Sequence, residues 1–348
     1  MKQVAFLCYI NRSGSTFLAK LLDEYAQIGV TPEARIPDGI AYGGPVRLNG
    51  RSDLERFMDR LYADYKFRAW GIYRDRLKER ISKQGFPVAA PVLLPVILSC
   101  YFKESLPHTV IYKCSYIRHL EAASKVFPEA KFIVLIRDLR AVYSSQKRSI
   151  DSTSGRPMAD NPVTLAALYN QIQGAIERLG TRAHICVVRY EDLVADTEQT
   201  LKRLLKFLGV DPKKTKVGTG TDYVDKIVPE QKHLHSHVTS PPIPQRIDAW
   251  RHELSRPEIL TLQKVSQDQL IKNGYALIPM GDWGFLDHIF YGWQWIRHYS
   301  RFLRQLGVAV RMAWHESNGL KRGRVDLIAP NLWRNLCAVG RRLRPGGR

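Results

Sequence analysis

Four continuous apolar runs, separated by longer stretches with helical spacing, set the strongest limit on how this chain can fold. Runs without polar alternation are typical of strands buried on both faces of a parallel sheet. The stretches 161–180 and 197–208 repeat apolar residues at helical spacing, with Thr197 as the expected cap of the second helix and Gly209 at its end. This alternation predicts an α/β fold, a central parallel sheet flanked by helices. The four runs are residues 3–10, 109–113, 131–136 and 184–189.

The stretch NRSGSTF lies directly after the first apolar run and before a helical pattern. The first N–H groups of a helix lack intrahelical acceptors, so such a turn can bind an anion. Gly14 permits close approach of the backbone and Arg12 adds positive charge, while hydroxyl donors come from Ser13, Ser15 and Thr16. A turn that only caps the helix explains these residues equally well. A Walker A pattern is missing and no acidic pair suggests a magnesium site, so a magnesium triphosphate is not the expected ligand.

A second strand-to-helix stretch, KFIVLIRDLRAVYSSQKRS, places Arg137 at the carboxyl end of a strand. Ser145 follows about two helical turns later, so both side chains can bind one anion. A salt bridge between Arg137 and Asp138 is the simpler alternative. Two anion sites at strand ends of one sheet indicate a ligand that is phosphorylated at both ends and lies across the carboxyl edge.

Taken in order, three segments resemble the PAPS-dependent sulfotransferases, most closely the tyrosylprotein and carbohydrate branches. They are RSGSTF, FIVLIRDLRAVYSS and VVRYEDLVADTEQTLKRLLKFLGV, and the resemblance covers roughly residues 1–275. It implies a P-loop-like sulfotransferase fold that uses 3′-phosphoadenosine 5′-phosphosulfate (PAPS) and releases 3′,5′-adenosine bisphosphate (PAP). It also implies that Arg137 and Ser145 bind the 3′-phosphate. The implied loop for the 5′-phosphosulfate consists of Arg12, Ser13, Gly14, Ser15 and Thr16.

The resemblance to the tyrosylprotein branch also implies catalytic residues. Glu33, which follows Arg12 by 21 residues, matches the general base, and Lys113 matches the lysine that stabilises the departing charge. With Arg12 they form the expected catalytic set, and Tyr190 matches a tyrosine that contacts the cofactor. From sequence context alone, Glu33 is also explained as an exposed acid paired with Arg35, and Tyr190 as a core tyrosine.

The chain departs from the branch pattern in two places. Cys-Ser follows Lys113 where the branch has Asp-Pro, and Ser149 stands where the branch has an Arg, with Arg148 one place earlier. The first departure concerns the role implied for Lys113, and the second lies four residues past Ser145 of the implied 3′-phosphate site. His108 and His119 are alternative bases, although neither lies in a matching motif.

The family's late cofactor loop is expected in HLHSHVTSPPIPQRIDAW, with Ser240 and Arg246 as cofactor-binding candidates and Ser236 as a further one. The histidines of this stretch alternate as HxHxH. A metal site is one reading, but neither an acid nor a cysteine completes a ligand set, so contact with the cofactor phosphates is favoured. We therefore expect no metal.

The formal charge of +20, from 53 Lys and Arg against 33 Asp and Glu, indicates an anionic partner. We expect a sulfotransferase domain over 1–284 and a basic, helical and amphipathic C-terminal extension over 285–348. From Phe290 to Trp314, arginines gather on one side of a helix and apolar residues on the neighbouring side, which suits an anionic membrane surface. A helix packed on its own domain fits equally well. Nucleic acid is not an expected partner, because no fold signature accompanies the basic stretches.

The five cysteines are odd in number and scattered, with Cys8, Cys114 and Cys186 inside expected strands. This usage favours a reducing compartment. The first residues predict a strand and not a secretory signal, and the most apolar segment, 87–98, is too short to span a bilayer. The expected location is cytoplasmic, with peripheral membrane contact as an option.

The favoured hypothesis is an enzyme that moves the sulfonate of PAPS in line onto a hydroxyl of a carbohydrate, peptide, or small-molecule or lipid acceptor. In-line transfer of this kind needs preorganised positive charge and a base, here a carboxylate. One alternative is a P-loop-like nucleotide phosphotransferase. Another is a non-catalytic basic protein that binds membranes or nucleic acid on the same scaffold. Acceptor walls are expected in loops such as 36–108.

Overall fold

A computed structural model gives the fold of the chain. It describes residues 3–34, 36, 47–103, 107–114, 120–151, 154–180, 184–213, 223–229, 246–279 and 281–319, with the backbone alone at Val224, Phe302 and 305–319. The chain divides into two compact units, residues 1–287 and 288–348.

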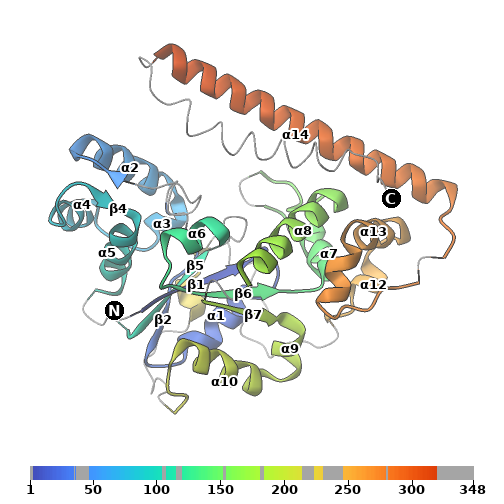
Figure 1. The fold of residues 1–348 in the computed structure, drawn as a ribbon, viewed down its shortest axis with the longest axis horizontal. Helices are drawn as coiled ribbons and strands as arrows, with labels where there is room; N and C mark the ends of the chain where they lie inside the picture. Colours follow the sequence, from blue (N-terminus) through green and yellow to red (C-terminus); the bar gives the residue numbers. More distant parts are fainter. Residues whose placement is uncertain are drawn as a thin grey trace. The chain divides into compact units, whose positions relative to one another are not determined.

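Five parallel strands form the central sheet in the order β2-β5-β1-β6-β7 (Figure 1). The chain passes from β5 to β6 across β1, so these two strands lie on opposite sides of β1. In open parallel sheets, ligands bind at the carboxyl ends of strands where the connections diverge, which makes the end of β1 the expected site. The strands are β1 (Gln3–Tyr9), β2 (Ile28–Val30), β5 (Thr109–Cys114), β6 (Lys131–Ile136) and β7 (His184–Arg189).

Helices cover both faces of this sheet, as the alternation of strands and helices predicted (Figure 1). Ala5, Leu7 and Tyr9 of β1 point into one core, which α1 (Ser15–Asp23), α9 (Tyr190–Ala195) and α10 (Thr197–Leu208) complete. Phe6 and Cys8 point into a second core on the opposite face of the sheet. Besides the helices within residues 47–89, the helices that contribute to it are α5 (Ala90–Phe102), α6 (Leu120–Val126), α7 (Leu139–Arg148), α8 (Pro162–Leu179), α12 (Trp250–Glu253) and α13 (Arg256–Lys272).

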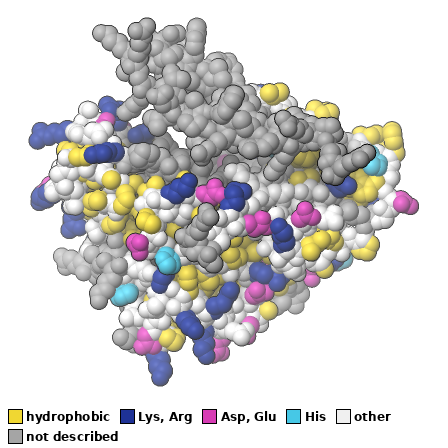
Figure 2. Space-filling view, viewed as in Figure 1, with side chains coloured by type: hydrophobic (Ala, Val, Ile, Leu, Met, Phe, Trp, Pro, Cys, Tyr) yellow, Lys and Arg dark blue, Asp and Glu magenta, His cyan; other side chains and the backbone are white. Residues whose placement is uncertain are grey.

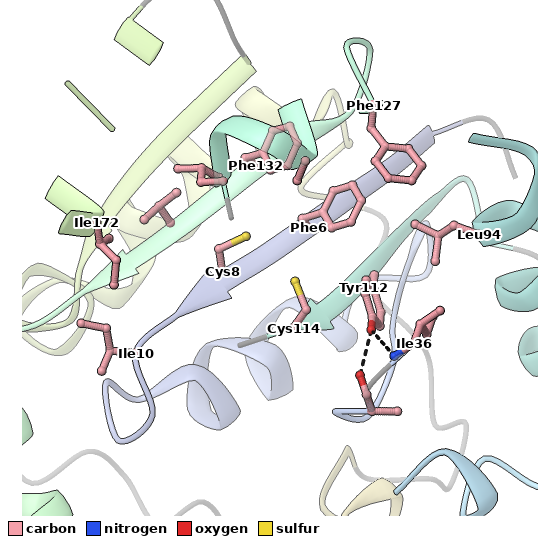
Figure 3. Close-up of a cluster of buried hydrophobic side chains, with 14 of the residues drawn as sticks. Phe6, Cys8, Ile10, Ile36, Leu94, Tyr112, Cys114, Phe127, Phe132 and Ile172 are labelled. Atoms are coloured by element: carbon pink, nitrogen blue, oxygen red, sulfur yellow. Dashed lines mark hydrogen bonds between the residues drawn. The ribbon is translucent and has the colours of Figure 1, made fainter. Parts of the chain in front are cut away.

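Aromatic packing in the second core fixes the segment that follows β2 (Figure 3). The ring of Phe6 stacks on Phe132 with centroids 5.0 Å apart. Tyr112 packs edge-on against Phe6, and its hydroxyl donates a 2.8 Å hydrogen bond to the carbonyl of Ala34 and accepts one from the N–H of Ile36. Ala34 and Ile36 come directly after Glu33 in the chain, so the core holds the neighbourhood of Glu33 in place.

A helical segment between β2 and β5, here called the insert (residues 47–103), lies outside the sheet (Figure 1). Two short antiparallel strands pair its first residues with the residues directly before α5. Buried leucines and Phe57, Phe67 and Trp70 give it an apolar interior that is continuous with the second core. Its elements are β3 (Arg47–Leu48), α2 (Arg51–Ala63), α3 (Tyr65–Arg68), α4 (Arg74–Ser82), β4 (Val88–Ala89) and α5.

The α/β prediction and its four main strands are confirmed to within one residue at each end. The predicted cap of α10 is wrong by one position. Asp196 is the cap, because its carboxylate accepts a 2.9 Å hydrogen bond from the N–H of Gln199, while the Thr197 hydroxyl donates to the carbonyl of Leu193. The three strand cysteines are free and buried, as small core residues.

Helix α14 (Phe285–Gly319) begins at the end of the first unit and forms the described part of the second. Leu286, Ile289, Trp293 and Ile296 recur along it at three- and four-residue spacing, which places them on one face. Among the residues that the structure describes, no helix combines the length and the apolarity needed to cross a membrane. On the face of the molecule in Figure 2, Lys and Arg side chains are interspersed with acidic ones.

Candidate active site

The turn after β1 forms a tight anion-binding loop. Arg12 and Gly14 both have positive φ angles, 72° and 90°, and Gly14 is the residue before α1. A Cβ atom at Gly14 would lie 2.5 Å from Cε2 of Tyr190, so only glycine allows this ring to approach the loop. The first N–H groups of α1 therefore lie in a loop with the buried hydroxyl groups of Ser13, Ser15 and Thr16.

Lys113, the penultimate residue of β5, lies beside this loop. Its Nζ donates a 2.9 Å hydrogen bond to Oγ1 of Thr16, and the side chain is buried. The ammonium lies 5.7 Å from the ring centre of Tyr9 and 5.6 Å from that of Tyr223. Burial lowers the pKa of Lys113 to about 8, against the opposing effect of Glu33. A buried ammonium next to an anion loop is suited to stabilise developing negative charge.

Glu33 follows β2 and receives hydrogen bonds on both carboxylate oxygens. The hydroxyl of Tyr9 donates to Oε2 at 2.6 Å, and Nζ of Lys66 donates to Oε1 at 2.7 Å. Burial alone raises the pKa of Glu33, but Lys66, Lys113 and these hydrogen bonds outweigh it and lower the pKa to about 2. We call Thr16, Tyr9, Glu33, Lys66 and Lys113 the lysine end of the site.

Arg137, at the carboxyl end of β6, organises the second end of the site through contacts with several segments. Its Nη1 donates to the carbonyl of Arg12 and its Nη2 to the carbonyl of Arg246, each at 3.2 Å, and its guanidinium lies 4.3 Å from the ring centre of Tyr190. Nε of Arg12 donates to Oγ of Ser145 at 3.2 Å. Burial lowers the pKa of Arg12, and the neighbouring charges of Arg137 and Arg148 lower it further.

Two more arginines complete this cluster through one acid. Arg148 and Arg246 bind Glu253 at 2.7 Å and 2.8 Å, and the hydroxyl of Ser144 donates to the same carboxylate. Burial lowers the pKa of Arg148, with further lowering from Arg246 and Arg137. The cluster contains four guanidinium groups and one carboxylate, so it has an excess of positive charge, which suits a phosphate. We call this cluster the arginine end: Arg12, Arg137, Ser145, Arg148, Arg246 and Glu253.

The structure gathers most of the predicted site residues at these two ends. Tyr190 lies between the loop and Arg137, and Glu33 lies with Lys113 near Thr16. Arg12, predicted as catalytic, directs its side chain toward Ser145 at the arginine end. Ser240 lies outside the described residues, as do Ser236, His119 and the three histidines of the HxHxH stretch.

Lys66 and Tyr9 were not predicted as site residues. No motif surrounds Lys66, which reaches Glu33 only because the insert folds against the sheet. The position of Tyr9 could have been predicted from the sequence, because Tyr9 ends β1 just before the loop and shares one face of the strand with Ala5 and Leu7. Among the described residues, no group of three or more His, Cys, Asp or Glu side chains could hold a metal ion. The expectation that no metal is needed stays a prediction.

Comparison with known proteins places the chain among sulfotransferases. Residues 6–214, well over half of the chain, match the model of the sulfotransferase family. The nodulation protein NoeE of Sinorhizobium fredii is 25% identical over 314 residues, which cover 82% of this chain and 69% of that protein.

Solved structures agree on the fold. The sulfotransferase domain of the Synechococcus olefin synthase superposes with a TM-score of 0.53 at 20% identity, over 79% of this chain and 96% of that one. The sulfotransferase domain of the curacin biosynthetic pathway gives 0.52 at 19% identity, over 80% and 99%. The predicted family, enzyme class and fold are thereby confirmed, and the chain belongs to the sulfotransferase family of PAPS-dependent enzymes.

Proposed function

We propose that this chain transfers the sulfonate of PAPS to a hydroxyl of a carbohydrate, peptide, or small-molecule or lipid acceptor, with Glu33 as general base. The observation that carries the proposal is that Lys113 donates a hydrogen bond to Thr16 of the loop and also interacts electrostatically with Glu33. A loop hydroxyl, a buried ammonium and a carboxylate follow one another at the carboxyl edge of β1 and β5. This order leads from the anion loop to a base, as sulfonate transfer requires.

The arginine end has the groups to hold the 3′-phosphate of PAPS. Nε of Arg137 is buried and has no hydrogen-bond partner among the described residues. A buried donor without a partner is costly, and a phosphate oxygen would satisfy it. Burial lowers the pKa of Arg12 and Arg148, and repulsion from neighbouring arginines lowers it further. This repulsion supports the same role, because a bound anion relieves it. We assign the 3′-phosphate to Arg137, Ser145 and Arg12, with Arg148 and Arg246 nearby.

The loop and the lysine end serve the 5′ side. When bound, PAPS supplies the sulfonate group that is transferred. The N–H groups of residues 14–16 and the ammonium of Lys113 are suited to stabilise charge on the sulfonate and the leaving phosphate. Glu33 takes the proton of the acceptor hydroxyl as the new bond forms. Because protein groups supply this positive charge, we propose that transfer needs no metal and continues in the presence of EDTA.

Calorimetry with PAP and AMP tests the cofactor assignment. We expect PAP to bind the wild type much more tightly than AMP, and Arg137→Ala to lose about 100-fold in PAP affinity, since it removes charge-assisted hydrogen bonds to the 3′-phosphate. AMP affinity should change little. Arg178→Ala is the control, because Arg178 forms an exposed ion pair with Glu121 far along the sequence from the loop. Equal affinities for PAP and AMP would contradict the assignment.

We also propose that residues 285–348 attach the protein to an anionic membrane surface. The apolar face of α14 and the nearby Arg297, Arg301 and Arg304 support this, because such helices lie in the headgroup region. Sedimentation with vesicles that contain phosphatidylserine should pull down the protein at low salt and release it at high salt. Equal binding to neutral phosphatidylcholine vesicles, or none to either, would oppose the proposal.

A further inference from the structure

Lys66 ties the proposed general base to the insert. It lies on α3, a single helical turn outside the central sheet, and its Nζ lies 2.7 Å from Oε1 of Glu33. The two side chains are only 17% and 23% exposed, so the pair is shielded from water on most sides. Removal of either charge from such a pair is costly, because it leaves the other charge largely buried without its partner.

The hydrogen bonds of Glu33 restrict how it can act as a base. Tyr9 occupies Oε2 and Lys66 occupies Oε1, and Lys113 contributes a second positive charge nearby. A carboxylate held this way has a low pKa and accepts a proton poorly. The acceptor hydroxyl can reach this base only where one of the two hydrogen bonds opens. Tyr9 is fixed in the core, whereas Lys66 is partly exposed on a flexible side chain, so Oε1 is the oxygen that Lys66 can leave free.

The movement of charge during transfer indicates which anion Lys66 can pair with after Glu33 is protonated. The acceptor O–H bond breaks and its proton goes to Glu33, while the acceptor oxygen bonds to sulfur. The bond from sulfur to the 5′-phosphate oxygen breaks, and that phosphate keeps the electron pair. Glu33 becomes neutral at the moment when a sulfate ester anion forms on the oxygen that faced it. Lys66 therefore loses the Glu33 carboxylate as its counter-ion, and the sulfate ester becomes a new counter-ion within reach.

We propose that Lys66 is a positioning residue that transfers its ion pair from Glu33 to the sulfate ester product. This inference rests on the proposed function, with Glu33 as the base. In the acceptor-free enzyme Lys66 holds the carboxylate in place. After transfer it binds the ester, so the product side of the site is an anion subsite built from Lys66.

Methyl sulfate, the smallest sulfate ester, is the probe. Its dissociation constant is measured by ligand-observed NMR on protein with and without PAP, for wild type, Glu33→Gln and the double variant Glu33→Gln/Lys66→Met. Glu33→Gln imitates the protonated base and frees Lys66. We expect about tenfold tighter methyl sulfate binding by Glu33→Gln than by wild type, since one unfavourable charge and one competing ion pair are removed.

The double variant should lose this gain, and Glu33→Gln/Lys66→Arg should keep most of it. Glu33→Gln/Lys78→Met is the matched control, because Lys78 on the same insert forms an ion pair with Glu55 that is exposed to water. Equal binding by Glu33→Gln and Glu33→Gln/Lys66→Met overturns the proposal, and so does a Glu33→Gln variant that binds no better than wild type. Loss of PAP discrimination would instead refute the proposed function, so the two failures are distinguishable.

Discussion

The two ends of the site arrange their charges in opposite ways. The arginine end holds four guanidinium groups and one carboxylate, Glu253, which pairs with Arg148 and Arg246. Burial and mutual repulsion lower the pKa of Arg12 and Arg148. At the lysine end, Lys113, Glu33 and Lys66 alternate in sign, and the two ammonium groups help to lower the pKa of Glu33 to about 2. One end has surplus charge of one sign, and the other is nearly balanced.

This difference separates binding from chemistry. Surplus positive charge is suited to a ligand whose negative charge does not change, such as a 3′-phosphate. At the lysine end, Glu33 can accept a proton and the neighbouring lysines can change their ion-pair partners while the reaction proceeds. The comparison predicts that substitutions at the arginine end reduce cofactor affinity, and that substitutions at the lysine end reduce the rate of transfer.

Glu33→Gln should have the largest effect. It keeps the shape of the side chain and removes the base, so kcat should fall about 1000-fold, within the range that general base catalysis contributes. PAP affinity should stay within about threefold of wild type, because Glu33 belongs to the end that does not hold the 3′-phosphate. Transfer from radiolabelled PAPS to an acceptor panel, together with calorimetry, measures both. Glu55→Gln on the insert is the control, and a large loss of PAP affinity in Glu33→Gln would break the separation.

The turn at Gly14 belongs to both ends, and its substitution should destabilise the whole site. Gly14→Ala places a side chain at a φ of 90° and against Tyr190, which together should lower the free energy of unfolding by about 3 kcal/mol. Gly71→Ala separates the two causes, because Gly71 also has a positive φ but nothing within 4 Å of an added Cβ. It should cost about 1 kcal/mol in urea unfolding. If both variants lose the same free energy of unfolding, the close packing of Tyr190 against Gly14 does not contribute to stability.

Lys113 should make the stability of the lysine end depend on pH. Its pKa is about 8 in the folded protein against 10.5 as the ordinary value, so between these values the unfolded chain binds more protons at this group. The free energy of unfolding of the wild type should therefore rise with pH in this window, by up to about 3 kcal/mol relative to Lys113→Met. Urea unfolding of both proteins at several pH values measures the difference. Parallel curves would show that Lys113 titrates normally and that its end is less buried than the comparison requires.

Sequence reasoning most readily predicts groups of residues that are local to one strand and the next helix. The loop 12–16 and the pair Arg137 and Ser145 are each contained in one strand–turn–helix unit, so spacing alone indicates that their members lie together. Lys66 gave no such signal, because a long-range contact between the insert and the sheet brings it to Glu33. Strand β2, with three residues, is too short to show a period, although it determines where Glu33 lies. The acid that organises the arginine end, Glu253, belongs to a four-residue helix more than 100 residues after Ser144.

Substitution of Arg246 should have the smallest effect, a modest loss of PAP affinity, and it can be compared with a closely matched control. It lies beside Arg137, which donates to its carbonyl, and it is held by Glu253. Arg246→Ala should lower PAP affinity about tenfold, the effect of one charge-assisted contact at a half-exposed position, and leave AMP affinity unchanged. Calorimetry with both nucleotides separates the 3′-phosphate from the rest of the ligand.

Arg251→Ala is matched to this variant in exposure and in its ion pair. The two arginine side chains are 45% and 41% exposed, and each forms one ion pair, at 2.8 Å and 3.1 Å. Arg251, however, lies over the ring of Trp250 and pairs with Asp248 instead of Glu253. If both variants lose the same PAP affinity, the loss reflects net charge and not a defined phosphate site. If only Arg246→Ala loses it, and transfer at saturating PAPS is unchanged, the arginine end binds the cofactor without taking part in the chemistry, as its surplus of one charge implies.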